Sequence, residues 1–266
     1  MKSLLTAILI LFTLPLHAQT DSRLQAMRTG DASRGWEAVG RLNMNGSGFC
    51  TATLISQTRV LTAAHCLFDT RTGQRIDLSR LEFLAGWRTG RAEAIRNVRR
   101  AEIWPGFDIA AGAAMSNVPS DLALLELDRP IRTTGITPLE VSTLLPERGE
   151  RVAVVSYGRG REETPSIQEA CYVLDQRGDG LSVFSCSIVP GSSGAPVFIV
   201  EDDTLRIISV ISARADGAEA PVSLGAQLGP RVAALHAAMD EGMPRAETRA
   251  SGGLPGARSS ARFVRP

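Results

Sequence analysis

The stretch FCTATLISQTRVLTAAHC, residues 49–66, decides the fold class. It contains two short runs, FCTATLIS and RVLTA, which are rich in Thr, Val and Leu and are separated by polar residues. Runs of this length and composition predict antiparallel β-strands. Cys50 and Cys66 lie on either side of the expected turn between them. The stretch therefore predicts a strand pair that a disulfide could clamp.

Similar short apolar or alternating runs, broken by turn residues, recur along the rest of the chain. Helical periodicity is almost absent from them. The pattern predicts an all-β protein. The further expected strands are 36–42, 81–87, 94–104, 122–127, 151–157, 168–175, 181–187, 196–201 and 205–213.

One helix is expected near the C-terminal end, over residues 229–242. Pro230 occupies a first-turn position, an apolar stripe follows at helical spacing, and Gly242 ends it. His236 lies on that stripe, where a packed histidine is more common than a catalytic one. The stripe consists of Val232, Leu235, His236 and Met239.

The two ends of the chain have distinct compositions. Residues 1–18 combine a basic start, an apolar run and Ala18, which predicts a secretory signal peptide. Spanning a bilayer takes about 20 apolar residues, so this shorter run does not predict a stable membrane anchor. Residues 19–35 are a flexible lead or a removable propeptide. Residues 243–266 form an Arg-rich tail, expected to be disordered and solvated, with weak contact to an anionic surface as the alternative.

The middle of the chain divides into two expected halves. Residues 128–150 are rich in Pro, Thr and Gly and form the best candidate linker. We therefore assign 36–135 to a first β unit and 136–228 to the linker and a second one. The formal net charge of +1 leaves no basic excess, so we expect no nucleic-acid partner. We also expect a monomer.

The four cysteines of this chain, marked for export, predict two disulfides. Three connectivities are possible, and local pairing is favoured: Cys50 with Cys66, and Cys171 with Cys186, which flank the hairpin signal DQRGDG. A zinc site is not expected, because no CxxC pair exists and only His65 and His236 remain after removal of the signal peptide. Export would place the protein in the periplasm or outside the cell.

Three short motifs contain residues suited to nucleophilic catalysis. A serine hydroxyl needs a base within hydrogen-bond reach and a third group that orients that base. His65 follows an apolar strand in VLTAAHC, and Asp121 opens the apolar run DLALLEL. Ser193 lies in PGSSGAPVF, where Gly191 and Gly194 permit a tight turn with free backbone amides.

The motifs TAAHC, DLALL and GSSGAP, in that order, resemble the trypsin-like, chymotrypsin-fold serine peptidases over residues 36–239. The resemblance implies two packed six-stranded antiparallel β-barrels, a C-terminal helix and a catalytic cleft between the barrels. It assigns Ser193 as nucleophile, His65 as general base and Asp121 as its orienting group. The Gly191 and Ser193 amides would form the oxyanion hole, with no metal or cofactor.

The resemblance also has departures. The digestive members carry an aspartate before the nucleophile, which pairs with a new N-terminus, but Ser192 stands here and no Ile-Val-Gly-Gly sequence occurs near the start. The chain is more similar to the bacterial secreted branch, which includes glutamyl endopeptidases. Ser187 would lie near the base of the primary pocket, Ser212 along the cleft and Arg214 near the pocket rim.

These residues leave the specificity and one functional alternative open. Arg214 could attract an acidic side chain, but glutamyl endopeptidases use a histidine near the position of Ile211. An exposed arginine at a strand edge is the alternative. The resemblance implies a secreted serine endopeptidase acting on proteins or peptides, and a catalytically silent binding or scaffold protein on the same fold is the other possibility.

Overall fold

The computed structural model describes residues 23–44, 46, 48–69, 71–201, 204–217 and 220–242. The expected signal peptide and the Arg-rich tail lie outside the described residues. None of the helices in this part of the chain has the length and apolar character needed to cross a bilayer.

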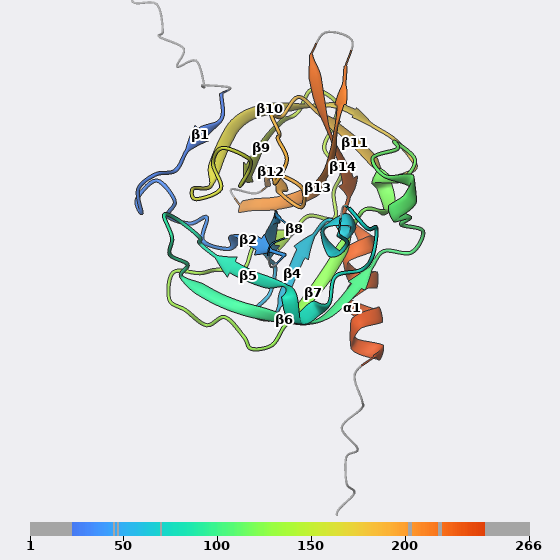
Figure 1. Ribbon diagram of the computed structural model, residues 1–266. Helices are drawn as coiled ribbons and strands as arrows, with labels where there is room; N and C mark the ends of the chain where they lie inside the picture. Colours follow the sequence, from blue (N-terminus) through green and yellow to red (C-terminus); the bar gives the residue numbers. More distant parts are fainter. Residues whose placement is uncertain are drawn as a thin grey trace, which may run out of the picture.

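Six strands of the first half close into an antiparallel barrel in the order β2-β3-β4-β7-β6-β5. Its core includes Leu42, Leu54 and Phe83, none of which is exposed. Figure 1 shows this barrel in the lower half of the molecule. The strands are β2 Val39–Asn43, β3 Phe49–Leu54, β4 Arg59–Thr62, β5 Glu82–Ala85, β6 Ala94–Ile103 and β7 Ala123–Leu127.

The second half forms a similar barrel, in the order β10-β11-β14-β13-β12-β9, which the pairing of β9 with β10 closes. Two short strands add to it: β1 Gln25–Ala26 pairs with β10, and β8 Glu140–Val141 pairs in parallel with β13. The predicted pair of six-stranded barrels is confirmed. The strands are β9 Arg151–Ser156, β10 Ser166–Gln176, β11 Leu181–Phe184, β12 Pro196–Glu201, β13 Thr204–Asp216 and β14 Pro221–Gln227.

Strand β14 was not among the strands expected from the sequence. It lies between β11 and β13 and pairs with both. Gly225 and Ser223 give it low β-propensity. A side chain at Gly225 would collide with Ser209 Oγ of the neighbouring strand, so close packing accounts for the weak signal at this position.

The segment before the first barrel is packed against the second. Met27 follows β1 and is only 3% exposed. The Trp36 ring lies 5.2 Å, centroid to centroid, from the Phe198 ring of β12. These contacts attach the beginning of the described chain to the second barrel.

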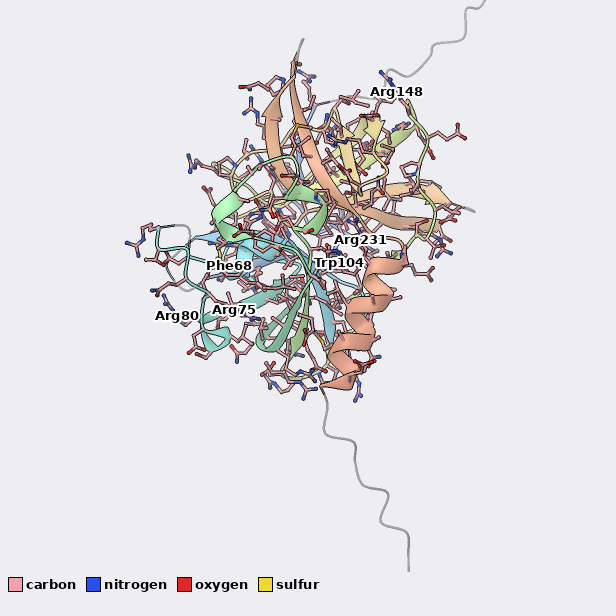
Figure 2. All side chains as sticks on the ribbon, turned by 90° about the vertical axis from the view of Figure 1, so that its right-hand side faces the viewer. Phe68, Arg75, Arg80, Trp104, Arg148 and Arg231 are labelled. Carbon is pink, nitrogen blue, oxygen red and sulfur yellow. A yellow bond between two sulfur atoms is a disulfide. The ribbon has the colours of Figure 1, made fainter. Side chains whose placement is uncertain are left out.

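The expected C-terminal helix is α1, Pro230–Glu241, and it packs beside β6 and β7 (Figure 1). Its buried residues Val232, Leu235 and Met239 belong to the large core cluster that includes the interior of the first barrel. At its start, the Arg231 guanidinium lies over the Trp104 ring, 5.4 Å from the centroid (Figure 2). The helix thereby joins the end of the second barrel to the first.

Polar contacts fix the other end of α1. Arg59 of β4 is 8% exposed and donates to Asp240 Oδ1 at 2.5 Å. The same guanidinium lies 3.3 Å from Nδ1 of His236. Burial and the neighbouring Arg59 charge lower the pKa of His236 below its ordinary value. His236 is therefore held in its neutral form at this junction.

The lowered pKa of His236 predicts a dependence of stability on pH. Since the folded-state pKa lies below the unfolded value of about 6.5, the neutral histidine stabilises the fold above that pH, and the contribution is lost as the pH falls toward the folded pKa. Denaturant unfolding at pH 7.5 and 5.5 should show a smaller acid-induced loss for His236→Gln than for the wild type. Equal losses in the two proteins would contradict this prediction.

Candidate active site

The segment carrying His65 is fixed at both ends. Strand β4 ends at Thr62, and the 3-10 helix Ala64–Leu67 follows directly. Cys66 is bonded to Cys50 of β3, as expected from the sequence. Because the backbone of His65 is tied to the neighbouring strand, its imidazole is held in place with 27% of the side chain exposed.

Asp121 follows the 3-10 helix Val118–Ser120, two residues before β7, and is 3% exposed. Its Oδ1 accepts from the His65 backbone N–H at 2.8 Å. Its Oδ2 lies 2.6 Å from His65 Nδ1 and accepts from Ser212 Oγ at 2.5 Å. Asp121, His65 and Ser212 thus form one hydrogen-bonded chain across the two barrels.

The environment of Asp121 favours its ionised form. Burial by itself raises the pKa of this carboxyl group, but the imidazole of His65 and the hydrogen bonds from His65 and Ser212 outweigh it and lower the pKa below its usual value. An ionised carboxylate only accepts hydrogen bonds, so Nδ1 of His65 carries a proton. Nε2 is then left with a lone pair that can accept a proton from a nucleophile.

Ser193 lies in the turn before β12, and this turn is bonded to both barrels. The Ser193 carbonyl accepts from Thr51 N–H at 2.8 Å, and Gly194 N–H donates to the Ile211 carbonyl at 2.7 Å. Gly194 has φ +80°, and a side chain there would collide with the Thr51 carbonyl and Thr62 Oγ1. The turn therefore lies against β3 and β4, next to the segment carrying His65.

Thr51 is a second link between the barrels that the sequence did not indicate. It is fully buried, and its Oγ1 donates to the Gly191 carbonyl at 2.9 Å and accepts from Tyr157 N–H at 3.0 Å. Thr62 Oγ1 in turn donates to the Thr51 carbonyl at 2.9 Å. One small side chain thus connects the strand bearing Cys50 to the turn bearing Ser193.

The hydroxyl of Ser193 makes no hydrogen bond to the imidazole in the described part of the chain. Nε2 of His65 instead lies 3.8 Å from Cys66 Sγ. Hydrogen bonds between nucleophile and base are often long in empty active sites and shorten when substrate binds. The structure thus brings three of the expected residues into one hydrogen-bonded chain and places Ser193 beside them through its backbone.

The peptide groups around Ser193 leave two amides available. The Pro190 carbonyl accepts from Arg159 N–H at 2.8 Å, and the Ser192 carbonyl accepts from Ala195 N–H at 3.0 Å. The C=O and N–H of a trans peptide point in opposite directions, so the N–H groups of Gly191 and Ser193 point away from those partners. Neither amide donates to another residue of the described chain.

Two cavities of about 310 Å³ each lie along the β13 side of this site. The first has an apolar wall of Phe107, Ile109 and Ala113 and reaches His65 and Asp121. The second contains Ser187 and Arg214, two of the residues expected to form the substrate pocket; Ser212 instead lines the first cavity. The remaining lining residues of the second cavity are Ser185, Cys186, Ile188, Ala220, Pro221 and Val222.

Cys171 is bonded to Cys186 at the wall of the second cavity, again as expected. Among the described residues, one group of three side chains brings metal-binding atoms within 4.8 Å of one another: Cys50, His65 and Cys66. The sulfur atoms of Cys50 and Cys66 are bonded to each other, so neither is available as a thiolate ligand.

Comparisons with known proteins agree with this architecture. Serine protease 23 of Homo sapiens and that of Mus musculus are each 29% identical over 170 residues, covering 56% of this chain. The chain spans only 43% of the length of these relatives. A solved structure described as "Structure of Glu endopeptidase in complex with MPD" has the same fold, with a TM-score of 0.66 and 15% identity, covering 83% of this chain and 98% of its own. The model of the trypsin-like peptidase domain matches residues 46–206, and the chain therefore belongs to that family.

Proposed function

We propose that this protein is an exported serine endopeptidase that cleaves peptide bonds through an acyl-enzyme on Ser193. The observation that carries the proposal is the hydrogen-bonded chain of Ser212, Asp121 and His65 beside the glycine turn that contains Ser193. Membership of the trypsin-like peptidase family supports the same reaction.

In the proposed reaction, Ser193 Oγ attacks the substrate carbonyl carbon while Nε2 of His65 removes the hydroxyl proton. The carbonyl oxygen becomes an oxyanion, which the Gly191 and Ser193 amides stabilise. The tetrahedral intermediate collapses, the C–N bond breaks, and His65 gives its proton to the leaving amine. Water, deprotonated by His65, then attacks the acyl carbon. The bond from this carbon to Ser193 Oγ breaks, and His65 returns its proton to Oγ, which regenerates the enzyme and releases the acid product. Asp121 stays ionised and stabilises the imidazolium in both steps.

The two disulfides support export. Structural disulfides form and persist in oxidising compartments, such as the bacterial periplasm and the extracellular medium. All four cysteines of the chain are paired in this way. We propose a periplasmic or extracellular location and an action on proteins or peptides as a monomer.

A catalytically silent binding protein is the alternative, and labelling with a fluorophosphonate probe distinguishes the two. The probe reacts with a serine that a base activates, so peptide mapping by mass spectrometry should locate it on Ser193. Heat-denatured protein is the control and should not react. A folded protein that remains unlabelled would favour the binding or scaffold function.

We further propose that the second cavity accepts an acidic side chain from the residue before the cleaved bond. Arg214 lines it, and its guanidinium forms no ion pair with any described carboxylate. The Ser187 hydroxyl lies in the same cavity and can donate to a carboxylate. The solved structure of similar fold that is described as a Glu endopeptidase supports this choice.

For this pocket we predict that Arg214→Gln loses most of its preference for Glu over Gln before the cleaved bond. A hydrogen bond to a charged group contributes about 1.5–3 kcal/mol, and the exposure of Arg214 places the effect near the lower end. The ratio of kcat/KM for peptides with Glu and with Gln before the cleaved bond should therefore fall by about 10-fold. Arg148→Gln, at the exposed Arg148 of Figure 2, is the matched control and should keep the wild-type ratio. A wild-type enzyme that cleaves both peptides equally well would refute the acidic preference.

A further inference from the structure

Arg161 lies in the loop between β9 and β10, and its guanidinium is directed at the turn of the candidate nucleophile. Nη1 donates to the Ser156 carbonyl, and Nη2 donates to Ser156 Oγ at 2.9 Å and to Ser192 Oγ at 3.0 Å. No described carboxylate forms an ion pair with this group. Burial lowers the pKa of Arg161 to about 10, and the nearby Glu162 charge offsets this only in part.

The contact with Ser192 reaches the backbone of the oxyanion turn. Ser192 is fully buried, its Oγ donates to the Tyr157 carbonyl at 3.1 Å, and it also accepts from Val189 N–H at 3.3 Å. Ser192 lies between Gly191 and Ser193, the residues whose amides face no partner. The Ser192 Cα adjoins the peptide group that carries the Ser193 amide, so a shift of the Ser192 side chain would rotate that group.

The same loop holds the turn at a second point. Arg159 N–H donates to the Pro190 carbonyl, which sets the orientation of the peptide group that includes the Gly191 amide. Gly158 lies between these contacts, and a side chain there would come within 2.8 Å of Arg161 Nη2. Glycine at position 158 thus leaves the space that the guanidinium fills.

The far side of the loop is attached to the first barrel. Trp87 Nε1 donates to the Glu162 carbonyl at 3.2 Å, and Thr89 N–H donates to the Glu163 carbonyl at 2.6 Å. These bonds, on the residues next to Arg161, limit the movement of its backbone. The guanidinium is therefore held between a fixed loop and the turn.

We infer that Arg161 is a positioning residue, which holds the Ser193 amide, beside the Gly191 amide, in the arrangement that binds the oxyanion and supplies a positive charge behind it. The inference rests on the proposed function. The digestive members use an aspartate at the position of Ser192 together with a new N-terminal amine. Here a cation from within the chain contacts this position, so the arrangement of the turn does not require that amine.

A cation without a carboxylate partner in a partly buried site costs free energy, and such groups concentrate at functional sites. The oxyanion exists in the transition state and the intermediate but not in the bound substrate. Removing the charge should therefore lower kcat and leave KM unchanged. The effect should be smaller than the 100- to 1000-fold loss that follows removal of an oxyanion-hole donor, and we expect about 10- to 100-fold.

The test compares Arg161→Gln, Arg161→Lys and the control Arg148→Gln, whose side chain is exposed and has no part in the Ser193 turn. Arg161→Gln should lose kcat at unchanged KM. Inhibition by a peptide aldehyde, which forms a tetrahedral adduct, should weaken by the same factor, whereas inhibition by a product peptide should not change. Arg161→Lys keeps the charge and should recover most of kcat, and Arg148→Gln should behave as the wild type.

The concentration of active sites is determined by complete labelling with a fluorophosphonate, and each kcat is calculated from that concentration. Misfolded protein therefore does not affect the comparison. The inference would be overturned if Arg161→Gln had the same kcat as the wild type. It would also be overturned if inhibition by the aldehyde and by the product peptide weakened equally. Activity that persists in Ser193→Ala would instead overturn the proposed function. The two failures are therefore distinguishable.

Discussion

Replacement of Ser193 by alanine is expected to lower kcat by about a millionfold, the scale seen when the nucleophile of a serine protease is removed. The physical reason is that no acyl-enzyme can form without Oγ, while the amides and the binding pockets remain. Peptide hydrolysis measured with a fluorogenic substrate, together with fluorophosphonate labelling, checks the prediction. Labelling should be abolished.

The fold of this variant should be unchanged. The Ser193 side chain makes no hydrogen bond in the described part of the chain, and the backbone bonds of the turn to Thr51 and Ile211 do not involve it. The thermal unfolding midpoint should therefore match that of the wild type. Ser192→Ala is the matched comparison and should still be labelled at completion, more slowly. Labelling that persists in Ser193→Ala would disprove the assignment of the nucleophile.

Replacement of Asp121 by asparagine is expected to lower kcat by about 10,000-fold at neutral pH, the effect of the same change in a well-studied triad. The carboxylate oxygens each accept a hydrogen bond from His65, and Oδ2 also accepts one from Ser212. An amide nitrogen facing Nδ1 would donate to it and move the imidazole proton to Nε2. The base would then lack its lone pair at the position where Ser193 needs it.

Ser212→Ala is the graded control for this prediction. It removes one of the hydrogen bonds that stabilise the Asp121 carboxylate but leaves both bonds from His65. One hydrogen bond to a charged group corresponds to roughly a 10-fold loss of kcat/KM. Steady-state kinetics at pH 8 should place Ser212→Ala well above Asp121→Asn. A loss below 100-fold in Asp121→Asn would show that another group orients His65.

The sequence predicted the parts of the fold that depend on local pattern. Alternating runs identified most strands of both barrels, and Pro230 and Gly242 bounded the helix. Both disulfide pairings followed from sequence proximity across expected turns. The candidate site followed from three motifs in a known order, because each motif combines a reactive side chain with the small residues that give it space.

What the sequence did not predict depends on contacts between distant segments. Gly225 lies in a strand whose signal is weak because Ser209 and Phe184 leave no room for a side chain. No local motif marks Thr51 or Arg161, because only folding brings them to the Ser193 turn. Thr51 bonds to Gly191 from 140 residues away in the chain. Local propensity carries no information about such partners.

The bonds of the Ser193 turn to Thr51 and Ile211 join segments that are synthesised at different times. A ribosome makes the first barrel, with His65 and Asp121, long before it reaches Ser193, and the Gly194 bond needs Ile211, which is made later still. A partly synthesised chain therefore contains the candidate base His65 before the candidate nucleophile Ser193, and then Ser193 before the strand that supports its turn. Under the proposed function, we therefore expect hydrolysis to begin only after the last strands of the second barrel have closed.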